Sequence, residues 1–218
     1  MQFPAELKCV IFDMDGVIID SEELHKRAYY HTFKSIGVEV SDALYKTLTG
    51  SSTINAFQRL VAHFELDLVP EELVQQKRAF YVDLFENDPN LHLVHGVEDL
   101  IKFLFKKEIT LVLASSSAMV NINRVFNRFD LNQYFTAKIS GADLVESKPN
   151  PEIFIKAAAL GNTPKEHCLV IEDSDNGVQA ANSAGIYVVG YQNPLAADQT
   201  LDKANQVIKE FEELKALL

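Results

Sequence analysis

Four short runs of apolar residues recur along the chain, and each ends in small or acidic residues. They cover residues 9–13, 110–116, 167–173 and 186–191. Continuous apolar runs of this length, with helix-like stretches between them, are typical of strands that are buried on both faces of a parallel sheet. The pattern predicts one strand at each run and an α/β fold with a doubly wound core.

The stretches between these runs carry helix signals. Residues 97–107 repeat apolar residues at helical spacing. Residues 149–161 have a proline in the first turn, and residues 174–185 begin at Ser174, a typical N-cap residue. The last stretch, residues 204–218, predicts a short edge strand and a terminal helix.

Residues 20 to about 90 break this alternation. A helical stripe of apolar residues follows Asp20, which we expect to form a capping pair with Glu23, and Pro70 opens a second long helix. The segments between these two helices are also helical in pattern, and no strand-like alternation is visible. The sequence therefore predicts an all-helical insert in an α/β protein, with the core over residues 1–17 and 92–218 and the helical domain over residues 18–91.

Composition narrows the class of protein. The 218 residues suffice for one core and a small second domain. With 31 acidic and 20 basic residues, a net charge of -11 and no dense run of lysine or arginine, we expect neither nucleic acid nor an anionic membrane as a partner. The N-terminus lacks the features of a signal peptide, no apolar run approaches a membrane span, and Cys9 and Cys168 are expected to be buried and reduced. These features predict a cytoplasmic protein; the oligomeric state is left open, and a monomer fits.

Polar side chains gather where the predicted strands end or turn. In an open parallel sheet, ligands bind beyond the carboxyl ends of the strands. An aspartate there is often only a helix cap, and a run of serines is often a turn, but four polar clusters in one chain point to a shared site. The clusters are Asp13 with Asp15, Ser115 with Ser116 and Ser117, Lys148, and Glu172 with Asp173.

These clusters favour phosphoryl transfer through a carboxylate. Acids that converge on one edge need a cation, and an all-oxygen set suits Mg²⁺. Asp13 can then stay ionised and act as a nucleophile, while Asp15 can protonate the leaving oxygen and later deprotonate water. Ser115 and Ser116, together with backbone amides at the start of the next helix, are candidate phosphate-binding residues. Lys148 can add positive charge beside the nucleophile and the phosphate.

Four stretches, "FDMDGVIIDS", "LVLASSS", "SKPNPEIF" and "VIEDSDNG", resemble the signature motifs of the haloacid dehalogenase (HAD) superfamily and span residues 12–177. The helical insert after the first motif resembles the C1 cap of the phosphoglycolate phosphatase and β-phosphoglucomutase branch. The resemblance implies a Rossmann-like core, dependence on Mg²⁺, Asp13 as nucleophile and Asp15 as acid/base. It also implies metal ligation by the Asp13 side chain, the Asp15 carbonyl and Asp173, with Glu172 ligating directly or through water.

The resemblance also separates reaction types. Dehalogenases of this superfamily lack the second aspartate, so Asp15 argues against dehalogenation. His25 stands where the β-phosphoglucomutase branch carries a cap-hinge histidine that helps to order the acid/base. The mutases carry K-G-x-x-R after the second cap helix, whereas this chain has Thr49 and Thr53 at the two cationic positions. Because hydroxyls alone hold a phosphate dianion poorly, hydrolysis is favoured. His25, Thr49 and Thr53 are the candidate substrate-contacting residues of the cap.

The leading interpretation is a Mg²⁺-dependent phosphatase that hydrolyses a small phosphomonoester, such as a sugar phosphate, through an aspartyl-phosphate. A β-phosphoglucomutase-like sugar-phosphate mutase is the alternative, and a non-enzymatic sensor of a phosphorylated ligand is a third hypothesis. In each case the partner is a small phosphorylated metabolite.

Overall fold

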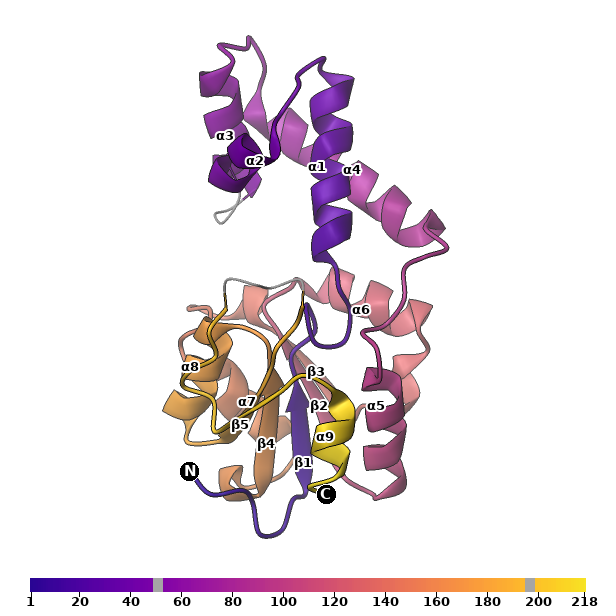
Figure 1. The fold of residues 1–218 in the computed structure, drawn as a ribbon, viewed down its shortest axis with the longest axis vertical. Coiled ribbons are helices and arrows are strands. Elements are labelled where there is room, and N and C mark those ends of the chain that lie inside the picture. Colours follow the sequence, from indigo (N-terminus) through magenta and orange to yellow (C-terminus); the bar gives the residue numbers. More distant parts are fainter. Residues whose placement is uncertain (49–52, 195–198) are drawn as a thin grey trace. The chain divides into compact units, whose positions relative to one another are not determined.

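The computed structural model describes residues 1–48, 53–194 and 199–218, and these fall into two compact units (Figure 1). A core unit comprises Met1–Asp20 and His92–Leu218, and a helical unit comprises Ser21–Leu91. We propose that the helical unit is the cap that the sequence predicts over residues 18–91.

The core unit is built on a six-stranded sheet in which every strand pair is parallel. The strand order β3-β2-β1-β4-β5-β6 reverses direction at β1, so the switch point where ligands bind in such sheets lies between β1 and β4. The strands are β1 (Cys9–Phe12), β2 (Thr110–Ser115), β3 (Ala137–Ser140), β4 (Cys168–Glu172), β5 (Tyr187–Tyr191) and β6 (Gln206–Ile208).

The α/β fold with an inserted helical segment is confirmed. All four apolar runs form strands, namely β1, β2, β4 and β5. The strand β3 was not predicted, because it lies at the edge of the sheet and three of its four residues are only half-buried. A half-buried edge strand leaves no continuous apolar run in the sequence.

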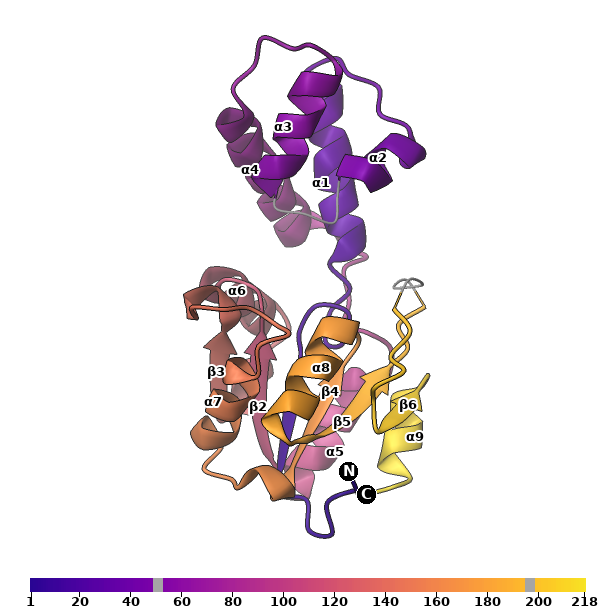
Figure 2. The same ribbon diagram turned by 90° about the vertical axis from the view of Figure 1, so that its left-hand side faces the viewer.

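Helices cover both faces of this sheet (Figure 2). The helices α7 and α8 pack on one face, and α5 lies behind the sheet on the other. The α-helices of the core unit are α5 (Val97–Lys106), α6 (Met119–Arg128), α7 (Glu152–Leu160), α8 (Asp175–Ala184) and α9 (Phe211–Lys215), and the 3-10 turns are η1 (Leu131–Gln133), η2 (Gly141–Asp143) and η3 (Lys165–His167).

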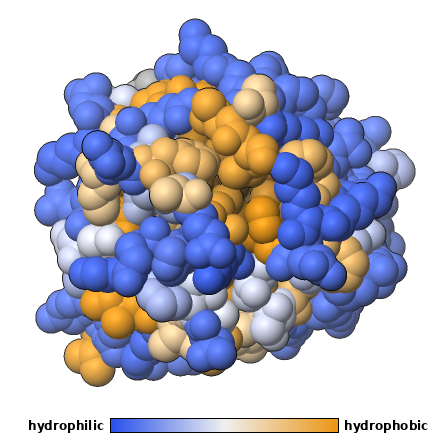
Figure 3. All heavy atoms as spheres, turned by 90° about the horizontal axis from the view of Figure 1, so that it is seen from below, coloured by the Kyte–Doolittle hydropathy of each residue, from blue (hydrophilic) through white to orange (hydrophobic). Residues whose placement is uncertain are grey.

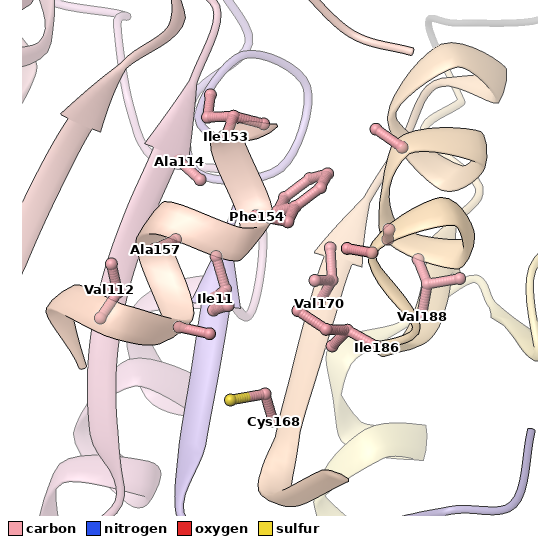
Figure 4. Close-up of a cluster of buried hydrophobic side chains, with 14 of the residues drawn as sticks. Ile11, Val112, Ala114, Ile153, Phe154, Ala157, Cys168, Val170, Ile186 and Val188 are labelled. Carbon is pink, nitrogen blue, oxygen red and sulfur yellow. The ribbon is translucent and has the colours of Figure 1, made fainter. Parts of the chain in front are cut away.

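A buried hydrophobic cluster joins α7 and α8 to the four central strands (Figure 4). Phe154 of α7 lies among Ile11 of β1, Val170 of β4 and Val188 of β5, and all four side chains are inaccessible to solvent. Complete burial of such a side chain contributes about 1.5–3 kcal/mol. The cluster therefore anchors the strands whose carboxyl ends carry the polar motifs.

The helical unit has a hydrophobic core of its own. Its helices are α1 (Glu22–Ser35), α2 (Asp42–Leu48), α3 (Thr53–His63) and α4 (Pro70–Asn87). Tyr29 and Phe33 of α1 pack on Phe57 of α3, and Arg27 forms an ion pair with the buried Asp88 at the end of α4. These contacts give α1–α4 a packed interior.

The predicted capping pair at the start of α1 is wrong. The helix begins at Glu22, and Ser21 is its N-cap residue without a side-chain capping hydrogen bond. Asp20 therefore lies one residue before the N-cap, and Glu23 stands at N2 rather than at N3, which the reciprocal bond would require. The predicted start of α4 at Pro70 is confirmed.

The surface hydropathy, the helix lengths and the state of the two cysteines can be compared with the expectations from composition. Seen from below Figure 1, hydrophilic residues cover most of the visible face and hydrophobic residues gather near its middle (Figure 3). Among the described residues, no helix has both the length and the apolar character needed to span a membrane. Cys9 and Cys168 are buried and form no disulfide. They are register partners in the neighbouring strands β1 and β4. Their mutual hydrogen bond and burial raise the pKa of Cys9.

Candidate active site

The parallel register brings polar residues of three neighbouring strands to one edge of the sheet. Phe12, the last residue of β1, pairs with Leu113 of β2 and with Ile171 of β4. Asp13 therefore emerges between the end of β2 and Glu172 at the end of β4, and its backbone N–H donates to Ile171. This is the switch point of the sheet, where the strand connections diverge and leave a crevice.

Lys148 lies in the middle of this edge. Its ammonium group donates to Asp13 Oδ1 at 2.5 Å, to Glu172 Oε1 at 2.8 Å and to the carbonyl of Ala114 at 3.0 Å. The lysine side chain is only 6% exposed. Burial alone would lower its pKa, but the charges of Asp13 and Glu172 raise the pKa of Lys148 above its usual value, so the amine stays protonated.

Glu172 is held by both of its oxygens. Oε1 accepts from Lys148, and Oε2 accepts from the backbone N–H and the hydroxyl of Ser174. Ser174 in turn caps α8 by accepting from Gly177, as the sequence predicts. Because both oxygens are occupied by protein donors, we propose that Glu172 acts on a metal indirectly, by fixing Lys148 and the start of α8.

Asp173 packs on the turn that follows β1. A β-carbon added to Gly16 would lie 1.9 Å from Oδ2 of Asp173, so glycine is the residue that leaves room for this carboxylate. Gly16 also has a φ of +85°, which an L side chain adopts only with strain. The Gly16 carbonyl accepts from Asn193, which fixes the turn from the other side. The structure thus places Asp173 beside the Asp13–Gly16 segment.

Burial and neighbouring carboxylates raise the pKa values of Asp13 and Asp173. Burial, with further contributions from Glu172 and Asp15, raises the pKa of Asp13 to about 7 even though Lys148 lowers it. Burial and the charge of Asp13 raise the pKa of Asp173 to about 8. Among the described residues, Lys148 is the one cation that lowers the pKa of both carboxyl groups, so negative charge exceeds positive charge here. An oxygen donor set with surplus negative charge fits a hard divalent cation such as Mg²⁺.

The donor set fits a metal only if backbone oxygen is included. Within the described ranges, no three acidic, histidine or cysteine side chains converge closely enough to form a metal site by themselves. The expected set of the Asp13 and Asp173 side chains with the Asp15 carbonyl needs only two side chains. Mg²⁺ retains several waters when it binds proteins, so such a sparse set is compatible with it.

The three consecutive serines at the end of β2 differ in their surroundings. Ser115 is buried, Ser116 is exposed, and Ser117 is half-buried. The Ser115 hydroxyl accepts from the Ser117 N–H at 3.0 Å, which makes a tight turn before α6 begins at Met119. The Ser117 hydroxyl donates to Asp15 Oδ2 at 2.7 Å. Sequence reasoning gave Ser117 no role of its own, because three consecutive serines carry no sign of which one faces Asp15.

His25 and Lys77 form a second polar pair, inside the helical unit. His25 Nδ1 lies 2.7 Å from Lys77 Nζ, and the imidazole stacks on Tyr81. Burial, reinforced by Lys77, lowers the pKa of His25 to about 4, and burial lowers the pKa of Lys77 to about 8. The imidazole is therefore neutral at pH 7, and its Nδ1 can accept from the ammonium group.

The structure describes one of the two threonines that the sequence proposed as substrate-contacting residues of the cap. Thr53 is half-buried and its side chain hydrogen-bonds to Tyr29, whereas Thr49 lies outside the described residues. The sequence alone left open whether Lys77 faces a cleft or the solvent; it stands in the apolar stripe of α4 and is only 4% exposed. A lysine within an otherwise apolar stripe is the signal that could have singled it out.

Comparison with known proteins assigns the chain that forms this site to a family. The model of the haloacid dehalogenase-like hydrolases matches residues 10–191, and the chain belongs to this family. More narrowly, it is a subfamily IA hydrolase of the β-phosphoglucomutase and phosphoglycolate phosphatase branch.

Individual relatives carry sugar- and nucleotide-phosphate names. The chain is 34% identical to the probable pseudouridine-5'-phosphatase of Drosophila melanogaster, over 94% of this chain and 90% of the relative. It is 31% identical to the phosphorylated carbohydrates phosphatase of Thermotoga maritima, over 83% and 82% of the two chains. The crystal structure of a "putative beta-phosphoglucomutase" from Thermotoga maritima matches 97% of this chain and 100% of its own with a TM-score of 0.88 and 30% identity.

Proposed function

We propose that the protein is a Mg²⁺-dependent phosphatase that hydrolyses a small phosphomonoester, with sugar phosphates as the substrate class, through an aspartyl-phosphate on Asp13. The observation that carries the proposal is the buried Asp13–Lys148–Glu172 arrangement at the switch point of the sheet. A structural ion pair would not need a second carboxylate at the same lysine, with Asp15 close enough to raise the pKa values of both Asp13 and Asp173 further.

In the first step, a carboxylate oxygen of Asp13 attacks phosphorus. The new P–O bond forms as the bond between phosphorus and the ester oxygen breaks, and the bonding pair leaves with that oxygen. Asp15, protonated at this stage, gives its proton to the departing oxygen, so a neutral alcohol is released. Lys148 remains charged and offsets the negative charge on the phosphoryl oxygens.

In the second step, water attacks the phosphorus of the aspartyl-phosphate. The Asp15 carboxylate takes a proton from this water, the P–O bond to Asp13 breaks, and inorganic phosphate is released. Ser115 and Ser116 bind the phosphoryl oxygens, and backbone N–H groups at the start of α6 add further donors. A bound Mg²⁺, held by the Asp13 and Asp173 side chains and the Asp15 carbonyl, supplies Lewis-acid stabilisation of the phosphoryl charge.

Sugar phosphates are proposed because of the relatives and because of the helical unit. The Thermotoga maritima relative is named for phosphorylated carbohydrates. The buried Lys77 beside the neutral His25 offers a cation and an imidazole that polar substrate groups can contact. Both residues belong to the inserted unit, which is the part of the chain that we expect to select the substrate.

A sugar-phosphate mutase is the second candidate. The similarity to the crystal structure of a "putative beta-phosphoglucomutase", with a TM-score of 0.88 and 30% identity, favours it. The absence of cationic residues at positions 49 and 53 disfavours it, because a mutase must hold a doubly phosphorylated intermediate while that intermediate turns over. We therefore rank hydrolysis first.

The function is tested with a panel of sugar phosphates and other phosphomonoesters in Mg²⁺. The unaltered protein should release inorganic phosphate from at least one of them, and Asp13→Asn should abolish that release while the circular dichroism spectrum is unchanged. Retained turnover by Asp13→Asn would refute the nucleophile. Turnover of none of the esters by the unaltered protein would instead support a non-enzymatic sensor.

The two enzymatic candidates are separated by their products. The protein is incubated with β-glucose 1-phosphate and a glucose bisphosphate primer, and glucose 6-phosphate and free phosphate are followed together. Hydrolysis predicts that free phosphate forms faster. Faster formation of glucose 6-phosphate would replace our first candidate by the mutase.

A further inference from the structure

Asp15 is tied to the loop that follows β2 by a side-chain hydrogen bond. The Ser117 hydroxyl donates to Asp15 Oδ2 at 2.7 Å, and both residues belong to the core unit although 102 positions separate them in sequence. This loop also carries Ser116 and begins directly after Ser115, the last residue of β2, and these two are the proposed phosphate-binding residues. The hydrogen bond therefore links the proton carrier to the loop that would hold the phosphate.

The backbone of Ser117 is itself held at two points. Its N–H donates to the Ser115 hydroxyl at 3.0 Å, and its carbonyl accepts from the Ser140 hydroxyl at 2.9 Å. Ser115 and Ser140 pair across β2 and β3, and they are 1% and 2% exposed. Two buried serines at the ends of two strands thus fix the backbone of Ser117. Its hydroxyl is therefore held in position to hydrogen-bond to Asp15.

A hydroxyl is suited to this place for a chemical reason. A serine hydroxyl can donate a hydrogen bond to a carboxylate and can accept one from a carboxylic acid. An ammonium group would favour the ionised carboxylate and oppose its protonation, while an apolar side chain would hydrogen-bond to neither form. The contact with Ser117 can therefore persist through both steps in which Asp15 changes its protonation state.

We propose that Ser117 is a positioning residue, which holds the Asp15 carboxyl group at a fixed distance from the ester oxygen of a phosphate bound by the same loop. The proposal rests on the phosphatase function proposed above and deepens it. It assigns the three consecutive serines different tasks: Ser115 and Ser116 bind phosphate, and Ser117 orients the acid that protonates the leaving group.

The dependence of kcat/KM on the leaving group distinguishes positioning of the acid from a purely structural role of Ser117. An alkyl phosphate releases a poor leaving group, which needs a proton from Asp15, whereas p-nitrophenyl phosphate releases an aryl oxide that departs without one. The ratio kcat/KM reports the step in which the ester bond breaks. Loss of acid positioning should therefore lower kcat/KM for the alkyl ester and spare the aryl ester.

The experiment measures kcat/KM for both esters in Mg²⁺ with the unaltered protein, Ser117→Ala, Ser117→Thr, Ser117→Val and Ser116→Ala. We expect Ser117→Ala to lose about 10–100-fold on the alkyl ester and less than about 3-fold on the aryl ester, a part of the full contribution of a general acid. Ser117→Thr should recover most of the selective loss because it restores the hydroxyl. Ser116→Ala should lower both esters by similar factors, because phosphate contacts serve both.

Equal losses on the two esters in Ser117→Ala, or no loss on either, would overturn the assignment. If Ser117→Ala does not fold, the isosteric pair Ser117→Thr and Ser117→Val decides, since the two differ in one hydroxyl; equal ester ratios in this pair would overturn the assignment as well. Failure of the proposed function is recognised separately, because the unaltered protein would then hydrolyse neither ester, and both proposals would fall.

Discussion

The carboxylate of Glu172 occupies the space where a side chain of Gly177 would lie. A β-carbon on Gly177 would stand 1.8 Å from Glu172 Oε1, the same oxygen that accepts from Lys148. The start of α8 and the charged centre of the site are therefore packed against each other. A substitution at the start of this helix should therefore disturb the ion pairs of Lys148 with Glu172 and Asp13.

We first predict that Gly177→Ala destabilises the core unit. Alanine inside a helix normally gains about 1 kcal/mol over glycine. Here it must displace the buried Glu172 from Lys148, and mispairing of a buried charge costs about 3 kcal/mol or more, so the clash outweighs the helical gain. The measurement is the midpoint of urea unfolding, which should fall.

Gly37→Ala is the matched control for this prediction. Gly37 has a φ of +71° and no atom within 4 Å of its hypothetical β-carbon, so only backbone strain of about 1 kcal/mol should appear. A Gly177→Ala protein that unfolds at a higher urea concentration than the unaltered one would show that Glu172 can move at little cost.

Removal of Lys148 should destabilise the metal-free protein strongly. Lys148→Met leaves Asp13 and Glu172 buried without their cation, and breaking a buried pair in this way costs about 3–5 kcal/mol. The loss should be largest near pH 7 and smaller near pH 4, because protonation of the carboxyl groups removes the uncompensated charge. Unfolding free energies measured in EDTA at both pH values check this expectation.

Lys156→Met is the control for Lys148→Met. Lys156 forms an exposed ion pair with Glu152 one helical turn away, and pairs of this kind contribute about 0.3–0.5 kcal/mol. Equal effects of the two substitutions would mean that the site around Lys148 is far better solvated than its burial indicates.

The carboxylates of the site should make stability depend on pH and on Mg²⁺. The pKa of Asp13 is raised to about 7 and that of Asp173 to about 8, both from an unfolded value near 3.8. The folded state therefore binds more protons than the unfolded state across this interval, and its stability is lost as pH rises from about 4 to about 8. A divalent cation should restore stability at pH 8 and have little effect at pH 5.

Asp173→Asn isolates this dependence from other titrating groups. Without metal, the variant should be more stable than the unaltered protein at pH 8 and equally stable near pH 4, because asparagine resembles the protonated carboxyl. Thermal unfolding in EDTA and in Mg²⁺ provides the comparison. Identical pH profiles for the two proteins would contradict the raised pKa of Asp173.

His25 should titrate far below an ordinary histidine. Its pKa is lowered to about 4, first by burial and then by Lys77, so the imidazole should stay neutral at pH 5. Imidazole resonances followed by NMR give the value directly. Lys77→Met should raise the pKa of His25 but leave it below 6.5, because burial is the larger cause.

Lys26→Met provides the comparison for Lys77→Met. It removes one positive charge next to His25 in sequence, from a lysine that pairs with Asp42 instead. The pKa of His25 should not move in this variant. A shift as large as that of Lys77→Met would show that His25 senses general charge rather than the 2.7 Å contact with Lys77.

The sequence predicted those parts of the fold that leave strong local patterns. Strands β1, β2, β4 and β5 are buried on both faces, so each is a continuous apolar run, and the N-cap at Ser174 is a local signal as well. The half-buried β3 and the true N-cap of α1 leave no such local pattern in the sequence. Packing determines both how exposed an edge strand is and at which residue a helix begins.

The candidate site follows the same division. Asp13, Lys148 and Glu172 could be expected to meet, because the carboxyl ends of adjacent parallel strands share an edge. The contact between Ser117 and Asp15, the Gly16 and Gly177 positions that make room for carboxylates, and the burial of Lys77 depend on side-chain directions. Residue order along one chain does not encode those directions in any simple pattern.

The central claim is that Asp13 carries the phosphoryl group during turnover, and direct detection of that group tests it best. Asp15→Asn is mixed with p-nitrophenyl phosphate and Mg²⁺, because the aryl ester does not need the acid in the first step while attack by water in the second step still needs the base. The reaction is quenched in acid, and the peptides are mapped by mass spectrometry. We predict one added phosphoryl group on the peptide that contains Asp13, and none when Asp13→Asn is introduced as well. A phosphoryl group on another residue, or none at all while p-nitrophenol is still released, would contradict the account.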